Sequence, residues 1–264
     1  KNYFLKEKIK QNSYFIWNSK KKNIETIKQF KPLDLKLIIG VDSQKEILLK
    51  NTINFAEGNF TNNALLWGAR GNGKSSLIKS VFHKILISYK KLNLIQLNKN
   101  DIFDIEYIYS ILGKYNHFRF IIFIDDLSFE KIDSDYKIIK STLDGSIQNQ
   151  PTNILLYVSS NRRHLMPRDM IDNERSSAIH TDESVEEKIS LSDRFGLWIG
   201  FHKLSQIDYL KIIETYCHHY DIDYNEEINK KAIQWSLQRG NRTGRTAWQF
   251  ILSTASDQNL KIKI

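Results

Sequence analysis

Residues 68–75 constrain the fold of this chain more than any other stretch. They match the pattern G-x-x-x-x-G-K-[ST], with Gly73, Lys74 and Ser75 at its end. In such a loop, glycines allow a tight turn that points backbone N–H groups at phosphate oxygens, and the following helix adds the positive end of its dipole. Residues 64–67 before the loop are apolar like a buried strand, and residues 76–86 have apolar side chains at helical spacing. The sequence therefore predicts a strand, a phosphate-binding loop and a helix, in that order.

The loop predicts ATP and Mg²⁺ as cofactors. Lys74 is expected to reach the β- and γ-phosphates, and the Ser75 hydroxyl is expected to bind Mg²⁺. The expected nucleotide contacts are Gly68, Ala69, Arg70, Gly71, Asn72, Gly73, Lys74, Ser75 and Ser76.

A second apolar run, residues 118–124, ends in two acids, Asp125 and Asp126. Such a run is typical of a parallel strand buried on both faces, and ligands of open α/β sheets lie at the carboxyl ends of the strands. We expect Asp125 to hold Mg²⁺ and Asp126, or a nearby acid, to orient the attacking water. A further apolar run ends in Asn161, which could hydrogen-bond that water or the γ-phosphate.

The remaining pattern predicts an α/β chain in three parts. Residues 1–32 are interpreted as a basic helical arm, residues 33–203 as the nucleotide-binding domain and residues 204–264 as a helical lid of three helices. The other expected strands are 92–97, 153–161 and 197–201, and the other expected helices are 43–57, 102–113, 136–143, 205–220, 225–239 and 243–256. Residues 168–190 carry many acids without clear periodicity and are expected to form an exposed loop.

Charge and cysteine content narrow the partners. Residues 1–31 hold nine lysines against two glutamates, whereas the whole chain carries a formal charge of +9. The arm could therefore bind nucleic acid or an acidic partner, or it could be a solvated extension that packs on a neighbour. Cys217 is the single cysteine, and no apolar stretch reaches the roughly 18–20 residues of a membrane span. A cytoplasmic protein is expected.

The ordered motifs resemble those of the AAA+ ATPases. More narrowly, residues 66–76, 125–130 and 160–165 are similar to a family of bacterial P-loop proteins catalogued as domain of unknown function 815, over roughly residues 33–256. The resemblance implies a five-stranded parallel sheet with the P-loop strand central, a C-terminal helical lid, ATP bound between them, and assembly into a ring or partial ring.

The resemblance also implies roles for single residues. Asn161 would be sensor 1, Arg194 the arginine finger directed at a neighbour's γ-phosphate, and Arg245, or alternatively Arg242, sensor 2. The family usually has glutamate after the metal-binding acid, where this chain has Asp126. Either Asp126 or Glu130 is then the catalytic base.

The function predicted is that of an AAA+ ATPase, an oligomer that couples Mg-ATP hydrolysis to the remodelling of an unknown protein client. The alternative is a nucleotide-dependent switch, similar to a helicase loader, that binds DNA or a protein partner and hydrolyses little ATP. A small-molecule kinase is disfavoured, because such an enzyme needs neither the helical tail nor the sensor-like arginines.

Overall fold

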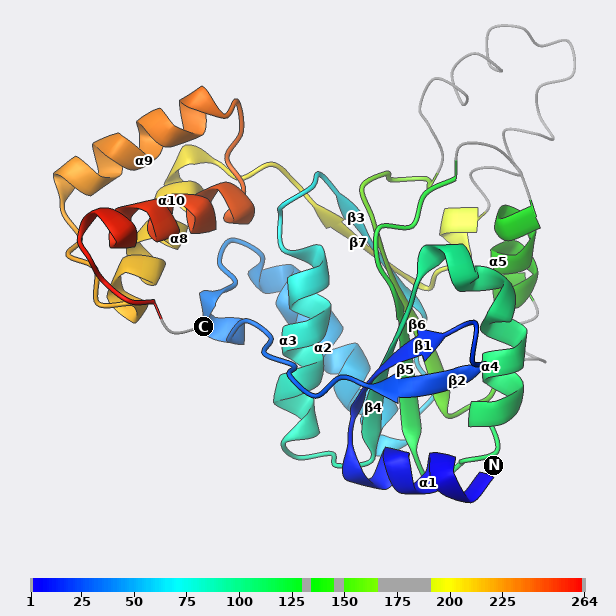
Figure 1. Cartoon of the computed structure of the whole chain (residues 1–264). Helices are drawn as coiled ribbons and strands as arrows, with labels where there is room; N and C mark the ends of the chain where they lie inside the picture. Colours follow the sequence, from blue (N-terminus) through cyan, green and yellow to red (C-terminus); the bar gives the residue numbers. More distant parts are fainter. Residues whose placement is uncertain (1, 130–133, 145–149, 166–190, 263–264) are drawn as a thin grey trace, which may run out of the picture.

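A seven-stranded sheet runs through the part of the chain described by the computed structural model, which comprises residues 2–129, 134–144, 150–165 and 191–262 (Figure 1). Its strand order is β2-β1-β4-β5-β6-β3-β7. The strands are β1 (Tyr14–Asn18), β2 (Asn23–Thr26), β3 (Ala64–Gly68), β4 (Leu92–Leu97), β5 (Arg119–Ile124), β6 (Ile154–Ser160) and β7 (Leu197–Phe201). All neighbours pair in parallel except β1 and β2. The five predicted parallel strands are thus present.

Helices cover both faces of the sheet, as expected for strands that are apolar on both sides. Helices α2 and α3 lie on one face of the sheet, and α4 and α5 lie on the other (Figure 1). Their apolar side chains belong to two separate core clusters, one on each face. The helices of this part are α1 (Asn2–Gln11), α2 (Asp42–Glu57), α3 (Lys74–Leu86), α4 (Ile105–Leu112) and α5 (Ser134–Asp144), with short 3₁₀ turns η1 (Leu35–Leu37) and η2 (Lys99–Asp104).

The prediction of helix throughout residues 1–31 is wrong in its second half. Only α1 is helical there, and β1 and β2 extend the sheet beyond β4. The reason is a period of two: Phe15 and Trp17 are buried in the core, whereas Ile16 between them is exposed. A helix would not place alternate residues on one face.

The P-loop strand is also not central. β3 lies second from one edge, between β6 and the edge strand β7, and the middle of the order is β5. The carboxyl ends of β3, β5 and β6 still meet at one edge of the sheet, because the three strands run in parallel.

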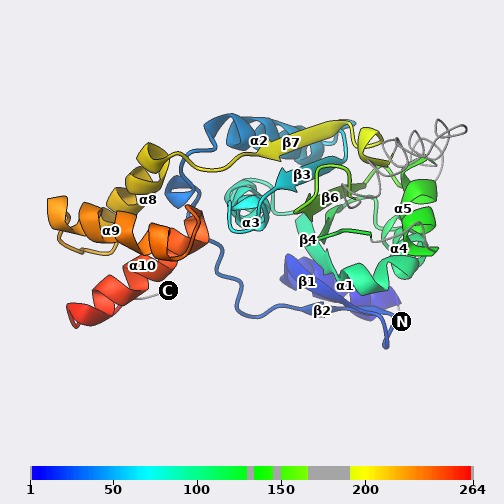
Figure 2. The same ribbon diagram turned by 90° about the horizontal axis from the view of Figure 1, so that it is seen from above.

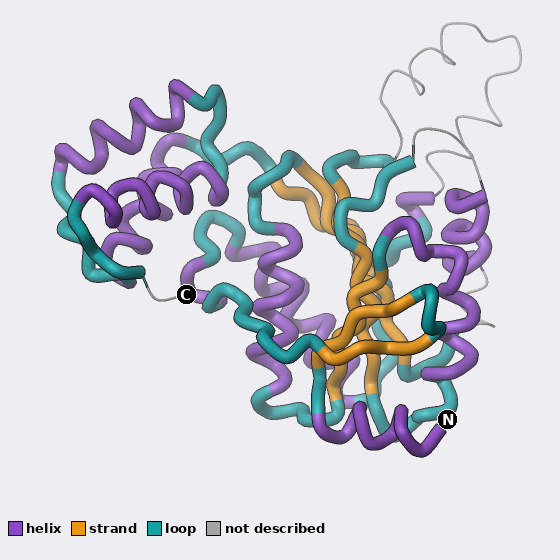
Figure 3. Tube along the Cα trace, in the orientation of Figure 1, coloured by secondary structure: helices purple, strands orange, loops and turns teal. Residues whose placement is uncertain are grey.

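The last three helices form a separate bundle beside α3, reached through the segment after β7 (Figures 2 and 3). They are α8 (Gln206–His219), α9 (Glu226–Gln238) and α10 (Gly244–Asp257), close to the predicted ranges. Their apolar side chains form a cluster that includes Cys217 and, from η1, Leu37. Leu35 and Ile38, on either side of Leu37, belong instead to a cluster on the sheet. The η1 segment therefore joins the helical bundle to the sheet.

No helix in the described ranges combines the length and apolarity needed to cross a bilayer.

Candidate nucleotide-binding site

Glycines set the course of the loop between β3 and α3. Gly68, Gly71 and Gly73 have φ angles of +139°, +81° and +86°, which side chains disfavour. A Cβ atom at Gly68 would lie 2.1 Å from the Phe201 carbonyl oxygen of β7. The glycine at position 68 therefore lets the P-loop strand pack directly against its neighbour.

Lys74, the first residue of α3, is folded back onto this loop. Its Nζ donates hydrogen bonds to the carbonyl oxygens of Gly68 at 2.7 Å and Ala69 at 2.8 Å, and to Oδ1 of Asn161 at 3.2 Å. Burial lowers the pKa of Lys74 to about 8, against the opposing attraction of Asp125 and Asp126. A buried ammonium group thus lies where phosphate charge would stabilise it.

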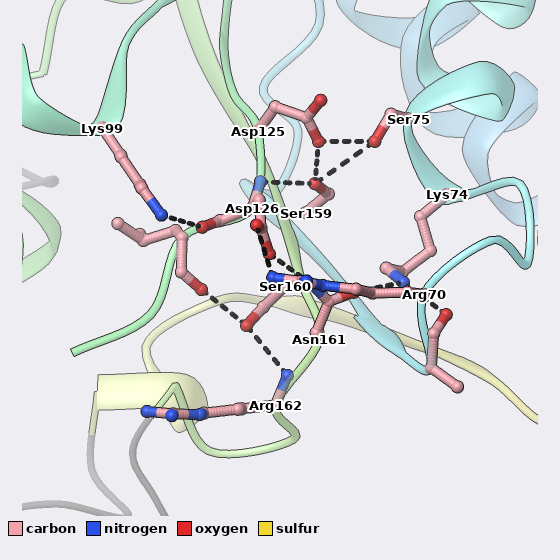
Figure 4. Close-up of polar contacts among 12 residues, drawn as sticks. Arg70, Lys74, Ser75, Lys99, Asp125, Asp126, Ser159, Ser160, Asn161 and Arg162 are labelled. Atoms are coloured by element: carbon pink, nitrogen blue, oxygen red, sulfur yellow. Dashed lines mark hydrogen bonds and ion pairs between the residues drawn. The ribbon is translucent and has the colours of Figure 1, made fainter. Parts of the chain in front are cut away.

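Three oxygen-bearing side chains meet next to Lys74 (Figure 4). Oδ1 of Asp125 accepts hydrogen bonds of 2.5 Å from both Ser75 Oγ and Ser159 Oγ. Ser159 Oγ also accepts a hydrogen bond of 3.0 Å from the backbone N–H of Asp126. The hydroxyl of Ser159 therefore holds both acids that follow β5.

Asp126 is held from two sides. Asn161 Nδ2 donates to its Oδ1, and the Arg70 guanidinium lies 3.3 Å from its Oδ2 (Figure 4). The backbone of Asp126 has a φ angle of +54°, which is uncommon for a residue with a side chain. Asn161 thus bridges Lys74 and Asp126, and the loop arginine braces the second acid.

These groups line one end of a cavity of about 870 Å³ between the sheet and the helical bundle. Ligand pockets commonly measure roughly 300–1,000 Å³. The polar end is lined by Arg70, Gly71, Asn72, Gly73, Lys74, Ser75, Ser76, Asp125, Asp126, Ser159 and Asn161. The other end is lined by the 31–39 segment and by Ile212, Tyr216, His219, Tyr220 and Trp248 of the bundle. Tyr216 and Tyr220 both pack against Trp248, with ring centroids 5.8 and 5.4 Å apart.

The two arginines left as alternatives by the sequence occupy different places. Arg245 lines the cavity, and its backbone N–H donates a hydrogen bond of 3.2 Å to the Gly71 carbonyl. Arg242 does not line this cavity, and its Nη2 donates to Oε1 of Gln206 at 3.2 Å. Of the two arginines, Arg245 is therefore the one that lines the cavity beside Lys74.

The other expected catalytic residues are not gathered in the cavity. Arg194 lies just before β7, whereas the cavity lies at the carboxyl ends of the strands, and it is not among the lining residues. Glu130 falls outside the described residues.

The oxygens of Ser75 and Asp125 suit Mg²⁺, which is bound through few protein oxygens together with water and substrate phosphate. A site built only from three or more histidine, cysteine, aspartate or glutamate side chains is absent from the described ranges. The donor set thus fits a metal that arrives with a phosphate ligand.

Sequence reasoning missed Ser159 and the aromatic end of the cavity. Ser159 lies two residues before Asn161, near the carboxyl end of β6. Because β5 and β6 are parallel, their carboxyl ends meet at one edge of the sheet, and this position could have indicated a contact between Ser159 and the acids after β5. The aromatic residues gave no such signal, since their spacing is that of any helix core.

A family model described as "Protein of unknown function (DUF815)" matches residues 10–258. No curated protein matches the sequence. Among solved structures, a variant of Thermotoga maritima RuvB is similar, with a TM-score of 0.53, 16% identity, and coverage of 88% of this chain and 74% of the other.

Two further structures are similar in fold. For the Aeropyrum pernix Orc1 protein in complex with DNA, the TM-score is 0.56, with 14% identity and coverage of 83% of this chain and 61% of the other. For domain III of the Thermotoga maritima replication initiation protein DnaA, the TM-score is 0.53, with 13% identity and coverage of 88% and 94%. The expected α/β fold with a mostly parallel sheet is confirmed, and it is similar to the folds of these three proteins.

Proposed function

The chain belongs to the DUF815 family, and we propose that it is an AAA+ ATPase that binds Mg-ATP between its P-loop and its helical bundle. The carrying observation is the division of the cavity. Lys74, Ser75 and two carboxylates line one end, which suits a triphosphate with Mg²⁺. The 31–39 segment and the helical bundle contribute mainly aromatic and aliphatic side chains, together with Lys31, Asp34 and His219, and this lining suits a flat base. A nucleoside triphosphate has both parts.

The proposed reaction is in-line attack of water on the γ-phosphate. Mg²⁺ held by Ser75 and Asp125 would neutralise charge on the phosphates. Lys74 exchanges its two loop carbonyl acceptors for phosphate oxygens, and Asp126 or Glu130 orients the water. Asn161, which contacts both Lys74 and Asp126, links the phosphate side of the site to the water side.

We propose that several copies assemble, with Arg194 of one copy serving the nucleotide of the next. The position of Arg194 before β7, away from its own cavity, supports this role in trans. A guanidinium placed against the charge of the transferring phosphoryl group is worth about 10³–10⁵ in rate. The client of such an assembly would be a protein of unknown identity.

A nucleotide-dependent switch is the second candidate, and the surroundings of Asp126 favour it. This acid is one methylene shorter than the usual glutamate, and Arg70 and Asn161 both hold its carboxylate. A base restrained in this way would orient water poorly, so ATP would stay bound and act mainly through the bundle.

We keep residues 33–203 and 204–264 as the proposed nucleotide-binding and lid domains, and a cytoplasmic location as a proposal from composition. Nucleic-acid binding by residues 1–32 also stays a prediction. Two lysines of this segment are already paired, Lys21 with Glu25 and Lys22 with Asp104.

Calorimetric titration with Mg-ATP tests the proposal. The unaltered protein should bind one equivalent, and Lys74→Ala should weaken binding at least tenfold, because it removes the buried cation of the site. Lys84→Ala, which removes an exposed lysine from the last turn of the same helix, is the matched control and should bind as tightly as the unaltered protein. Equal affinities of the three proteins would refute the proposed site.

A further inference from the structure

A second cavity adjoins the first, between the P-loop and the start of α10, and the two share the lining residues Arg70, Gly71, Asn72, Leu204 and Arg245. Its volume is about 670 Å³, and its lining includes Ala69, Asn72, Leu204 and Thr246. Every charged residue that lines it is basic: Arg70, Lys203, Arg239, Arg242 and Arg245. No aspartate or glutamate of the described ranges is among the lining residues, so the cavity is a concentrated positive site.

The five cations differ in how far they are already engaged. Arg70 is paired with Asp126, and the Arg239 guanidinium lies 3.3 Å from the centroid of the Trp235 ring. Arg245 also lines the nucleotide cavity. Lys203 and Arg242 line the second cavity but not the nucleotide cavity. Neither has an ion-pair partner within the described part of the chain. These two side chains are therefore the ones left for another ligand.

Arg242 has an incomplete set of hydrogen bonds. Its Nη2 donates to Gln206, but its Nε is shielded from solvent and has no acceptor among the residues that the structure describes. A buried donor without an acceptor is energetically unfavourable. The Arg242 side chain is therefore only partly engaged by the residues that the structure describes.

The start of α10 adds to the positive potential. This helix of 14 residues begins at Gly244, and Thr243, which caps it, and Thr246 both line the cavity. The first turn of a helix carries a partial positive charge that favours anions, phosphate in particular. A single carboxylate would neutralise only one of several cations, so a ligand with multiple negative charges fits better.

We propose that this cavity is a second phosphate-binding site, distinct from the nucleotide pocket and centred on Lys203 and Arg242. The guanidinium fork of Arg242 suits phosphate oxygens, and Lys203 contributes a mobile point charge. The phosphate could belong to a free ion or to the backbone of a nucleic-acid strand, and both have the chemistry that the cavity recognises. The site lies next to the P-loop, which contributes Ala69, Arg70, Gly71 and Asn72 to its lining.

The test uses the whole protein with its nucleotide pocket filled by the slowly hydrolysed analogue ATPγS. In one arm, radiolabelled inorganic phosphate is measured by equilibrium dialysis. In the other arm, a fluorescein-labelled single-stranded DNA oligonucleotide is measured by anisotropy at several salt concentrations. The double variant Lys203→Gln/Arg242→Gln is compared with Lys211→Gln/Lys230→Gln, which removes two exposed lysines of α8 and α9.

We expect the Lys203→Gln/Arg242→Gln protein to bind the probe at least tenfold more weakly, with unchanged ATPγS affinity, and the control pair to match the unaltered protein. Binding in the dialysis arm alone identifies a free phosphate ligand, and binding in the DNA arm identifies a strand. For the strand, log K falls linearly with log salt, and loss of two phosphate contacts makes this slope less steep by about 1.4.

Three results would overturn the proposal. They are no binding in either arm, equal binding by the two double variants, and equally tight binding of poly-glutamate at the same ionic strength, which would show that the cavity reads charge alone. If the double variant does not fold, the single variant Lys203→Gln is measured in its place, because Lys203 is exposed and its replacement should not disturb folding.

Discussion

Ser159 on β6 donates a hydrogen bond of 2.5 Å from its Oγ to Oδ1 of Asp125, the acid that follows β5. The same Asp125 oxygen accepts a hydrogen bond from Ser75, the proposed second metal ligand. Ser159 Oγ also accepts a hydrogen bond from the backbone N–H of Asp126. One hydroxyl therefore positions both Asp125, the proposed Mg²⁺ ligand, and Asp126, which is proposed to orient the attacking water. Groups that orient metal ligands in this way strongly affect metal affinity.

Ser159→Ala should raise the Mg²⁺ concentration needed for half-maximal ATP hydrolysis by about 10- to 100-fold, because the Asp125 carboxylate loses a donor that orients it. Binding of ATP without Mg²⁺ should not change. Ser160→Ala is the matched control, since the Ser160 hydroxyl bonds the Leu127 carbonyl instead and should affect stability without shifting the Mg²⁺ dependence. Equal shifts in the two variants would remove Ser159 from the metal site.

The affinity for ATP should fall as the pH rises above about 8. Burial lowers the pKa of Lys74 to about 8 in the free protein, and contact with the triphosphate should raise it again. Above pH 8, binding must therefore take up a proton, and Kd should rise by up to about tenfold per pH unit. Below pH 8, Lys74 is protonated in both states and this dependence disappears.

Titrations between pH 7 and 9.5 in buffers of different ionisation enthalpy measure this proton uptake. Phosphate esters have a second pKa of about 6, so the ligand is about 90% ionised at pH 7 and contributes almost no titration above pH 8. Adenosine, which lacks phosphate, should bind without pH dependence. A flat Kd for ATP across the range would contradict the placement of Lys74.

Gly68→Ala should lower the free energy of unfolding by roughly 3 kcal/mol or more, from the combined cost of backbone strain and overpacking. The new methyl group would lie 2.1 Å from the Phe201 carbonyl oxygen at a φ of +139°. Gly240→Ala is the comparison, since that glycine also has a positive φ, +65°, but no atom lies within 4 Å of the added Cβ. It should cost only about 1 kcal/mol. Urea denaturation of both variants checks the difference, and equal losses would argue against close packing of β3 on β7.

Arg194→Ala should keep ATP affinity and lower turnover by about 10³-fold, if Arg194 acts on the nucleotide of a neighbouring copy. Mixing this variant with Lys74→Ala protein should restore part of the activity, because an intact nucleotide site then meets an intact arginine. Absence of any rescue, with co-assembly of the two proteins shown by pull-down, would exclude a role in trans.

Sequence patterns predicted the elements of the site whose chemistry demands particular residues at fixed spacing. The run from β3 through Lys74 to α3, and the strand ending in Asp125 and Asp126, lie as expected, because glycines and continuous apolar runs have few other uses. The lid helices were also close to their predicted ranges, with side-chain caps at Ser205, Asn225 and Thr243.

The missed features depend on contacts between distant segments. β1 is short, and Phe15 and Trp17 pack against residues far along the chain, so the surrounding lysines favoured a helical interpretation. The hydrogen bonds of Ser159 and the pairing of Arg70 with Asp126 arise only when the ends of parallel strands meet. Nor does sequence spacing distinguish Arg242 from Arg245, although both line the second cavity and only Arg245 also lines the cavity beside Lys74.

The rate of Mg-ATP hydrolysis as a function of protein concentration, measured for the unaltered protein, Asp126→Ala and Glu130→Ala, tests the proposed activity most directly. An ATPase that acts as an assembly should show a specific activity that rises with concentration and is abolished in one of the two variants, which identifies the base. A rate near zero at every concentration, despite saturable ATP binding, would contradict an ATPase and leave the nucleotide switch. Hydrolysis that persists undiminished in both variants would place the chemistry outside this site.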